Sequence, residues 1–318
     1  TLSAVESICV TRCVAVAAET GAAGRKPDGT RLAGLTLGFS TYGMKTLRTE
    51  QAIERIADAG FDSVEIAIMK GWDADPETLE PGRRIAIRNR LADRRVFVRS
   101  LMEHLHIDEP GRSRQQRLER LKRAAELAHD LDPARPPLVQ TTIGGGGHWA
   151  EKRDLFAAEL EQWVRVAGRH ELTIAVKPHR GGAFSRPDQA VELIERLGSP
   201  PRLKMCFDYS HYDFRDMPLE EAVRTALPYV GHVAVKDVAR DTAGRLRFRL
   251  PGETGRIDYP KLLRLLFDGG YRGDVCCEVS SQIWSQPGYD PLAAAETSYR
   301  NMARAFERAG VPRLRRTR

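Results

Sequence analysis

The sequence has few of the features that mark secreted, membrane-spanning and nucleotide-binding proteins. It contains 5 cysteines in 318 residues, and Cys9 and Cys13 have no second pair at zinc-site spacing. No apolar run approaches the ~18 residues of a membrane span. No Gly-x-Gly-x-x-Gly follows the first predicted strand, and no Walker motif occurs. We therefore expect a cytoplasmic protein in a reducing compartment, with no membrane partner and no dinucleotide.

The two ends of the chain differ in composition from its middle. Residues 1–33 are rich in alanine and form a low-complexity leader, which we expect to be poorly ordered. The leader lacks a clean apolar core followed by a cleavage site, so a secreted protein is only the alternative to a cytoplasmic one. Residues 312–318 contain four arginines of a chain whose net charge is +7. Such a tail is usually solvated, and we expect no nucleic-acid partner.

Between these ends, residues 34–311 alternate short apolar runs with segments of helical periodicity. At 42% hydrophobic residues, the chain can bury a sizeable core. Strands that alternate with helices indicate a parallel sheet, and eight such units match the size of a single (β/α)8 TIM barrel. A doubly wound sheet is the alternative. The eight predicted strands are 35–40, 61–68, 96–101, 138–143, 172–177, 203–208, 230–236 and 273–279.

Four predicted strands end in charged residues that share the parity of the small, inward-facing positions. Bulky apolar faces should pack on the helices and the smaller faces should line the barrel. Parallel strands deliver their carboxyl ends to one mouth, so we expect these charges to meet in a pocket where two acids balance two lysines. The alternative is that each residue caps its own strand in solvent. The four residues are Lys177, Asp208, Lys236 and Glu278, and His179 and His211 follow two of the strands.

Several short motifs in this order resemble the xylose-isomerase-like TIM barrels, the sugar phosphate isomerase and epimerase family that also contains endonuclease IV. They are LGFSTY at 37–42, DYSH at 208–211, VKD at 235–237, PGETGRIDY at 251–259, and Glu278 on the last strand. Each motif is weak alone, and together they are specific for the superfamily but not for a substrate. The resemblance covers roughly residues 35–309.

The resemblance implies a divalent metal held by a glutamate ending strand five, an aspartate ending strand six, a histidine on strand seven and a glutamate ending strand eight. Asp208 and Glu278 match two of these positions, and His211 matches the family's substrate-binding histidine. Lys177 and Ala234 stand at the other two. Two explanations remain open. Either Mn or Zn binds through Asp208, Glu278 and histidines such as His211, or the Lys177 ammonium replaces the metal and no cofactor is needed.

The expected roles follow from the chemistry of each side chain. Glu278 would remove a proton beside a carbonyl, with His211 or His179 as its acid partner, and Lys177 would polarise a substrate oxygen. Lys236 and His179 would bind substrate. Two further residues each have two possible roles. Glu65 would bind a hydroxyl or form an ion pair inside the barrel. Trp284 would stack on a sugar or cover the barrel.

The function that these expectations support is a sugar isomerase or epimerase acting on a small-molecule keto sugar or sugar phosphate. A lyase or dehydratase on an oxidised sugar would use the same enolisation and then expel a leaving group. A non-catalytic sugar-binding barrel with a decayed metal site is the third hypothesis. His104 and His106 follow the third strand, at the mouth or on an exposed loop. The glycines at 144–147 form either a phosphate cradle or a flexible turn. An oligomer is compatible with all three hypotheses.

Overall fold

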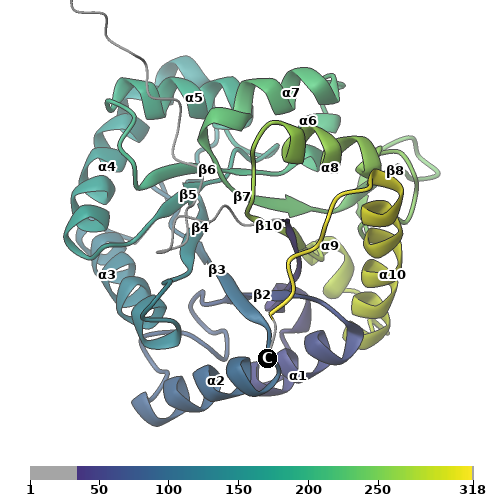
Figure 1. Cartoon of the computed structure of the whole chain (residues 1–318). Coiled ribbons are helices and arrows are strands. Elements are labelled where there is room, and N and C mark those ends of the chain that lie inside the picture. Colours follow the sequence, from purple (N-terminus) through teal and green to yellow (C-terminus); the bar gives the residue numbers. More distant parts are fainter. Residues whose placement is uncertain (1–33, 317–318) are drawn as a thin grey trace, which may run out of the picture.

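The computed structural model describes residues 34–316 and forms a closed barrel of parallel strands surrounded by helices (Figure 1). Each barrel strand pairs with its neighbours in parallel, and the first strand closes the barrel against the last. The fold class expected from the sequence is confirmed. The barrel strands are β1 (Thr36–Ser40), β2 (Ser63–Ala67), β3 (Phe97–His104), β4 (Leu138–Thr142), β5 (Ile174–Val176), β6 (Leu203–Phe207), β7 (Val230–Val235) and β10 (Asp274–Cys277).

Helices cover the outside of the barrel because each carries one apolar face toward the strands. Helix α1 ends at Gly60, which has φ 102° and takes the left-handed conformation that favours glycine. Helix α3 begins at Ser113, whose hydroxyl accepts a hydrogen bond from the Gln116 N–H at 3.2 Å. The outer helices are α1 (Thr49–Ala59), α2 (Pro81–Asp93), α3 (Arg114–Leu131), α4 (Trp149–Arg169), α5 (Pro187–Arg196), α7 (Leu219–Ala226), α8 (Tyr259–Asp268) and α10 (Pro291–Ala309).

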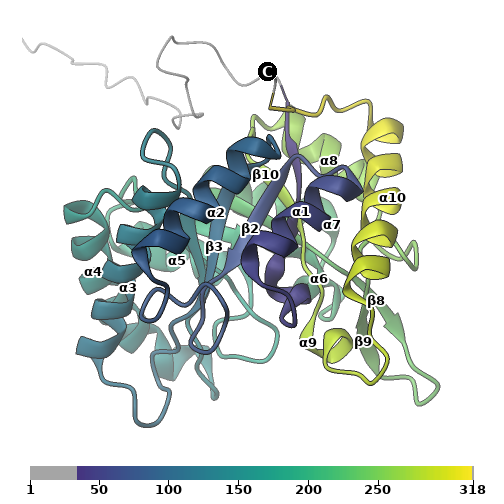
Figure 2. The same cartoon turned by 90° about the horizontal axis from the view of Figure 1, so that it is seen from below.

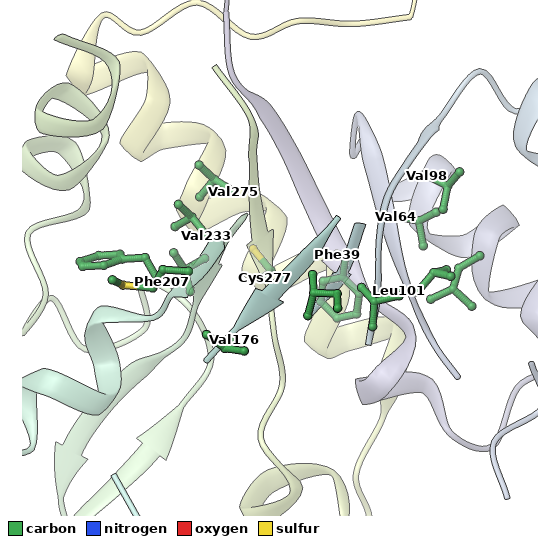
Figure 3. Packing of buried hydrophobic residues seen from close by; sticks show 14 of the residues in the cluster. Phe39, Val64, Val98, Leu101, Val176, Phe207, Val233, Val275 and Cys277 are labelled. Atoms are coloured by element: carbon green, nitrogen blue, oxygen red, sulfur yellow. The ribbon is translucent and has the colours of Figure 1, made fainter. Parts of the chain in front are cut away.

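The core is divided by strand parity into an outer layer and a barrel interior. Large side chains such as Phe207, Val233 and Val275 point outward and pack in the continuous apolar layer under the helices (Figure 3). Small side chains point inward, and Ala175, Cys206 and Ala234 form a separate buried cluster. The inward faces therefore leave room for polar side chains inside the barrel.

The structure differs from the sequence-based expectation at the carboxyl ends of the strands. The segment after β7, which contains none of the eight predicted strands, forms an antiparallel hairpin of β8 (Asp237–Arg240) and β9 (Leu246–Arg249). His211, expected to follow a strand, lies in the short helix α6 (Tyr209–Asp213) directly after β6. A further short helix, α9 (Ser281–Trp284), follows the last strand, and 3-10 turns occupy η1 (Thr41–Met44) and η2 (Leu227–Tyr229). The hairpin and α9 lie at the end of the barrel away from the C-terminal marker (Figure 2).

The first residues of the basic tail pack on the barrel, which differs from a solvated tail, whereas Arg315 and Arg316 are exposed and residues 317–318 lie outside the described residues. Leu35 and Arg313 form a parallel bridge, so the chain beyond α10 lies against the start of β1. The Arg313 guanidinium donates to both carboxylate oxygens of buried Asp62, at 2.8 and 2.9 Å. A bidentate pair of this kind compensates the desolvation of the Asp62 carboxylate.

The expected leader at 1–33 lies outside the described residues. Within 34–316, no helix combines the length and the apolar character needed to cross a bilayer.

Candidate active site

Two lysines and two acids meet inside the mouth of the barrel. The Lys177 Nζ lies 2.5 Å from Glu278 Oε2 and 3.7 Å from Asp208 Oδ2. The Lys236 Nζ lies 2.5 Å from Asp208 Oδ2 and 2.8 Å from Glu278 Oε1. All four side chains are at least nine-tenths buried. We call these four residues the lysine–carboxylate quartet.

The strands fix the quartet because its members are the first residues after four strand ends. Lys177 follows β5 and its N–H donates to Thr141 O at 2.8 Å. Glu278 follows β10 and its N–H donates to Val235 O at 3.0 Å. Asp208 caps α6 directly after β6. The backbone ladder thus continues through these residues and holds their side chains on the inward face.

The charges within the quartet stabilise one another. Burial alone would raise the pKa of Glu278, but the Lys177 and Lys236 ammoniums outweigh it and hold this pKa well below its usual range. Burial would also raise the pKa of Asp208, and Lys236 and Lys177 lower it instead. Conversely, burial would lower the pKa of Lys177, but Glu278 and its neighbours raise it well above the ordinary value. The opposite charges of Lys177, Asp208 and Glu278 thus each favour the ionised form of the others.

Two histidines lie beside the quartet and are uncharged at neutral pH. The His179 and His211 rings have centroids 4.2 Å apart. Burial, followed by the nearby Lys236 ammonium, lowers the pKa of His179 to about 4 and that of His211 well below its usual value. The backbone N–H of Gly181 donates to His179 Nδ1 at 3.3 Å, which leaves the proton of the neutral ring on Nε2.

His211 is tied more tightly than His179. Its Nδ1 accepts from the Arg180 backbone N–H at 3.5 Å, and its Nε2 lies 3.4 Å from Asp208 Oδ2. The ring is 1% exposed, so it has little freedom to move. This geometry suits a group that orients Asp208 and the cavity wall.

Three members of the quartet, Lys177, Lys236 and Glu278, line a cavity of about 590 Å³, and Asp208 lies behind them. The opposite side carries His104, whose pKa is lowered to about 4 by burial and then by His106. The His106 Nε2 lies 2.9 Å from Thr142 Oγ1. His104 and His106 therefore lie at the mouth of the barrel, and not on an exposed loop, which was the alternative from the sequence. The cavity is also lined by Tyr42, Phe184, Phe248, Ser280, Ser281 and the glycines at 144–146.

Phe248 is a cavity residue that the sequence did not reveal. It lies on β9, and its ring is 5.2 Å from the His211 ring and 5.2 Å from Lys236 Nζ. Its N–H donates to the Gln282 side chain on α9 at 3.3 Å, which ties the hairpin to the segment after the last barrel strand. The alternation of apolar and basic residues after Gly244 was the available signal for this strand.

Glu65 lies deeper in the barrel and is absent from the described residues that line the cavity. Its Oε2 accepts from Ser100 Oγ at 2.8 Å and lies 3.2 Å from His232 Nε2. Both Glu65 and His232 are at most 1% exposed. The position matches the ion pair inside the barrel that the sequence offered as the alternative to hydroxyl binding. We call Glu65, Ser100 and His232 the deep polar layer.

Cys276 adds a third type of ligand atom to this layer, within 4.8 Å of the ligand atoms of Glu65 and His232. Glu65 and His232 already pair with each other. Burial also raises the pKa of the Cys276 thiol well above its ordinary value, which disfavours the thiolate that a metal requires. We therefore interpret the layer as structural.

Trp284 lies in an aromatic group beside the cavity. Its ring centroid is 5.4 Å from that of Tyr42 and 6.2 Å from that of Trp72, and both contacts are edge-on. Tyr42 lines the cavity, whereas Trp284 stands behind it. This arrangement corresponds to the reading in which Trp284 covers the barrel.

Comparison with known proteins shows the family. The sequence profile described as xylose isomerase-like TIM barrel matches residues 53–308. The chain belongs to this family. A human protein named as a candidate hydroxypyruvate isomerase is 31% identical over 179 residues, which are 53% of this chain and 61% of the human protein. Its mouse counterpart is 30% identical over the same shares of the two chains. The match thus spans less than two thirds of these relatives.

Solved structures share the fold of the chain. A D-psicose 3-epimerase has a TM-score of 0.68 at 17% identity, with 87% of this chain and 100% of the epimerase covered. An L-ribulose 3-epimerase has a TM-score of 0.66 at 19% identity, with 87% and 96% covered. A family member from Mycobacterium smegmatis, solved in complex with magnesium, has a TM-score of 0.63 at 20% identity, covering 90% and 94%.

The residues at the mouth do not fit the metal that the family resemblance implies. A lysine ammonium repels a cation and has no lone pair to offer. At the strand-seven position, Ala234 has no ligand atom, and the nearby His232 belongs to the deep polar layer. Asp208 and Glu278 remain, but both are already engaged by the two lysines. We derive no chemical step through a metal.

Proposed function

We propose that the protein is an isomerase or epimerase that removes a proton from the carbon beside the carbonyl of a keto sugar. The observation that carries this proposal is the lysine–carboxylate quartet beside the cavity. Removing such a proton moves negative charge onto the carbonyl oxygen. Two fixed ammoniums beside that oxygen would stabilise the charge as it develops.

The size of this effect is sufficient to matter for catalysis. Removing one preorganised donor to a developing oxyanion costs about 10²–10³ in rate in well-studied enzymes. Lys177 and Lys236 are held by short hydrogen bonds of 2.5 Å to Glu278 and 2.5 Å to Asp208. The donors would therefore need little reorganisation when the substrate arrives.

Glu278 is our proposed base. In the free protein its two lysine partners keep it ionised and weakly basic. A substrate oxygen that takes over the Lys177 ammonium would remove part of this stabilisation and raise the pKa of Glu278 toward its ordinary value. Substrate binding would thus convert a charge partner into a proton acceptor.

His179 is our proposed acid partner. Its ring lines the cavity, and the hydrogen bond to Nδ1 leaves the Nε2 proton available for a substrate oxygen. His211 would position Asp208 and the Arg180 backbone, because both of its nitrogens are engaged within the protein. Lys236 would share the substrate oxygens with Lys177.

The shape and charge of the cavity favour a neutral sugar. Cavities that enclose drug-sized ligands span roughly 300–1,000 Å³, and this one has about 590 Å³. It reaches from the quartet to His106 and Thr142, so a three-carbon keto acid would fill only one end. Asp108 and Glu109 also line the cavity and are paired with Lys152 and Arg112, so no unpaired cation is offered to a phosphate by these residues. We therefore place the carbonyl at the quartet and the hydroxyls toward the histidines.

Hydrogen exchange with solvent tests the proposal. The purified chain would be incubated in D2O with fructose, psicose, ribulose and hydroxypyruvate, and deuterium at the carbon beside the carbonyl measured by NMR. We expect exchange with at least one ketose, lost in Glu278→Gln and kept in Glu126→Gln on the exposed face of α3. A dehydrated product would identify a lyase instead. Absence of exchange with every compound, or unchanged exchange in Glu278→Gln, would contradict the proposal.

A further inference from the structure

We propose that the ammoniums of Lys177 and Lys236 together replace the divalent metal of this family, and that the protein binds and uses no metal at its mouth. The metal position of the family lies between the ends of strands five to eight. In this chain the same space is filled by two cations that belong to the protein itself. The role of these cations in catalysis rests on the proposed function, whereas the exclusion of metal does not.

The carboxylate oxygens provide the first argument. Glu278 Oε2 accepts from Lys177 at 2.5 Å, and Glu278 Oε1 accepts from Lys236 at 2.8 Å. Asp208 Oδ2 accepts from Lys236 at 2.5 Å, and Asp208 Oδ1 accepts from Ser210 Oγ at 2.5 Å. Every oxygen of the two carboxylates is thus taken by a donor. A metal would have to displace these donors from a buried site.

The nitrogen ligands are the second argument. Mn and Zn sites combine carboxylates with imidazole nitrogens whose lone pairs face the metal. His211 directs one nitrogen to the Arg180 backbone and the other to Asp208. His232 is paired with Glu65 below the mouth. Among the described histidines beside the quartet, His179 remains, and its Nδ1 already accepts from the Gly181 N–H.

The charge balance is the third argument. Two ammoniums and two carboxylates sum to zero, so the quartet is neutral although it is buried. An added divalent cation would leave two uncompensated positive charges in a buried place, where unpaired charge is strongly disfavoured.

The replacement changes how the substrate is held. One metal ion chelates two neighbouring oxygens at one point, whereas Lys177 and Lys236 are two separate donors on different strands. Each bridges from Glu278 toward Asp208, so one could meet the carbonyl oxygen and the other its neighbouring hydroxyl. The substrate would therefore bind across the pair, with both oxygens facing the quartet.

Metal uptake by the full chain tests the inference without any substrate. The protein would be incubated with Mn²⁺ or Zn²⁺, separated from free metal, and measured by elemental analysis, with calorimetric titration of Mn²⁺ in parallel. We expect the native chain to retain far less than one metal per chain. Lys177→Glu restores the family's acidic ligand and should bind Mn²⁺ at least ~10-fold more tightly than the native chain. Lys122→Glu makes the same charge change on the outer surface and should behave as native.

The outcomes separate the inference from the proposed function. Stoichiometric Mn²⁺ or Zn²⁺ in the native chain, lost in Asp208→Asn, would overturn the inference. So would the failure of both Lys177→Glu and Lys177→Met to bind metal better than the native chain. If Lys177→Glu does not fold, the smaller change in Lys177→Met carries the test. A metal-free protein that exchanges no ketose hydrogen would contradict the proposed function and leave the inference standing.

Discussion

The barrel interior contains two polar groups that differ in what surrounds them, although both are buried. The lysine–carboxylate quartet comes from four strand ends and faces a cavity of about 590 Å³. The deep polar layer lies below it and is shut off, with Glu65 0% and His232 1% exposed. Buried charges seldom stabilise a fold better than apolar residues would. We therefore interpret the quartet as a group that serves chemistry at the cavity. We interpret the deep polar layer as part of the packing of the barrel.

Breaking the deep polar layer should give the largest effect on stability. His232→Leu removes the partner of the Glu65 carboxylate and leaves a buried charge uncompensated, at a cost of about 3–5 kcal/mol in the free energy of unfolding. The exchange rate per folded molecule should stay within about twofold. Denaturant unfolding measures the first and D2O exchange the second.

A matched double variant sharpens this prediction. Glu65→Met with His232→Leu replaces the whole pair by apolar side chains and should recover most of the lost stability. If His232→Leu instead abolishes exchange in a protein of native stability, the deep polar layer takes part in the chemistry and the comparison fails.

Changing the quartet should lower the rate of hydrogen exchange in the substrate. Lys177→Met keeps the length of the side chain and removes its charge, and we expect the exchange rate to fall by about 10²–10³. The loss should appear in kcat at saturating ketose and exceed what the unfolded fraction explains. A rate within twofold of native would mean that Lys177 serves only to neutralise Glu278.

Acid should destabilise the protein through two partly buried histidines. His104 and His179 have pKa values of about 4 in the folded chain, against about 6.5 when unfolded. Between these values the unfolded state binds more protons, so stability rises with pH. Each histidine accounts for about 3 kcal/mol across this range. Urea unfolding from about pH 4.5 to 7.5 measures the slope, and His104→Gln should make it shallower; an unchanged slope would contradict the burial of His104.

The smallest expected effect concerns the chain end. Arg313→Met removes the guanidinium that meets Asp62 and should lower the free energy of unfolding by about 2 kcal/mol. The Leu37 N–H still donates to Asp62 Oδ2 at 2.9 Å, which limits the loss. Arg304→Met, on the exposed face of α10, is the control. Equal unfolding midpoints for the two variants would show that the end of the chain adds nothing.

The sequence predicted the barrel and the position of the quartet because both follow from strand parity. Lys177, Asp208 and Glu278 could be placed together once their strands were recognised as parallel neighbours. Strand parity could not separate Glu65 from the cavity, because Glu65 also faces inward. The distinction depends on depth along the barrel and on the partner His232, and both are tertiary facts.

The hairpin and the docked chain end were beyond the reach of local patterns. The alternation of basic and apolar residues after Gly244 indicates a strand but not where it lies, and Phe248 reaches the cavity because the hairpin is tied to Gln282. In the sequence, Arg313 belongs to a basic tail, and only the structure shows that Asp62 lies beside it. In both cases the deciding contact joins residues that are far apart in the sequence.

The replacement of the metal by two lysines is the central claim, and exchange by a chelator-treated protein tests it most directly. The full chain would be treated with EDTA, freed of chelator, and assayed for deuterium uptake by the reactive ketose, with and without added Mn²⁺. We predict an exchange rate equal to that of untreated protein and no gain from Mn²⁺. Exchange that disappears on chelation and returns with Mn²⁺ would contradict the claim.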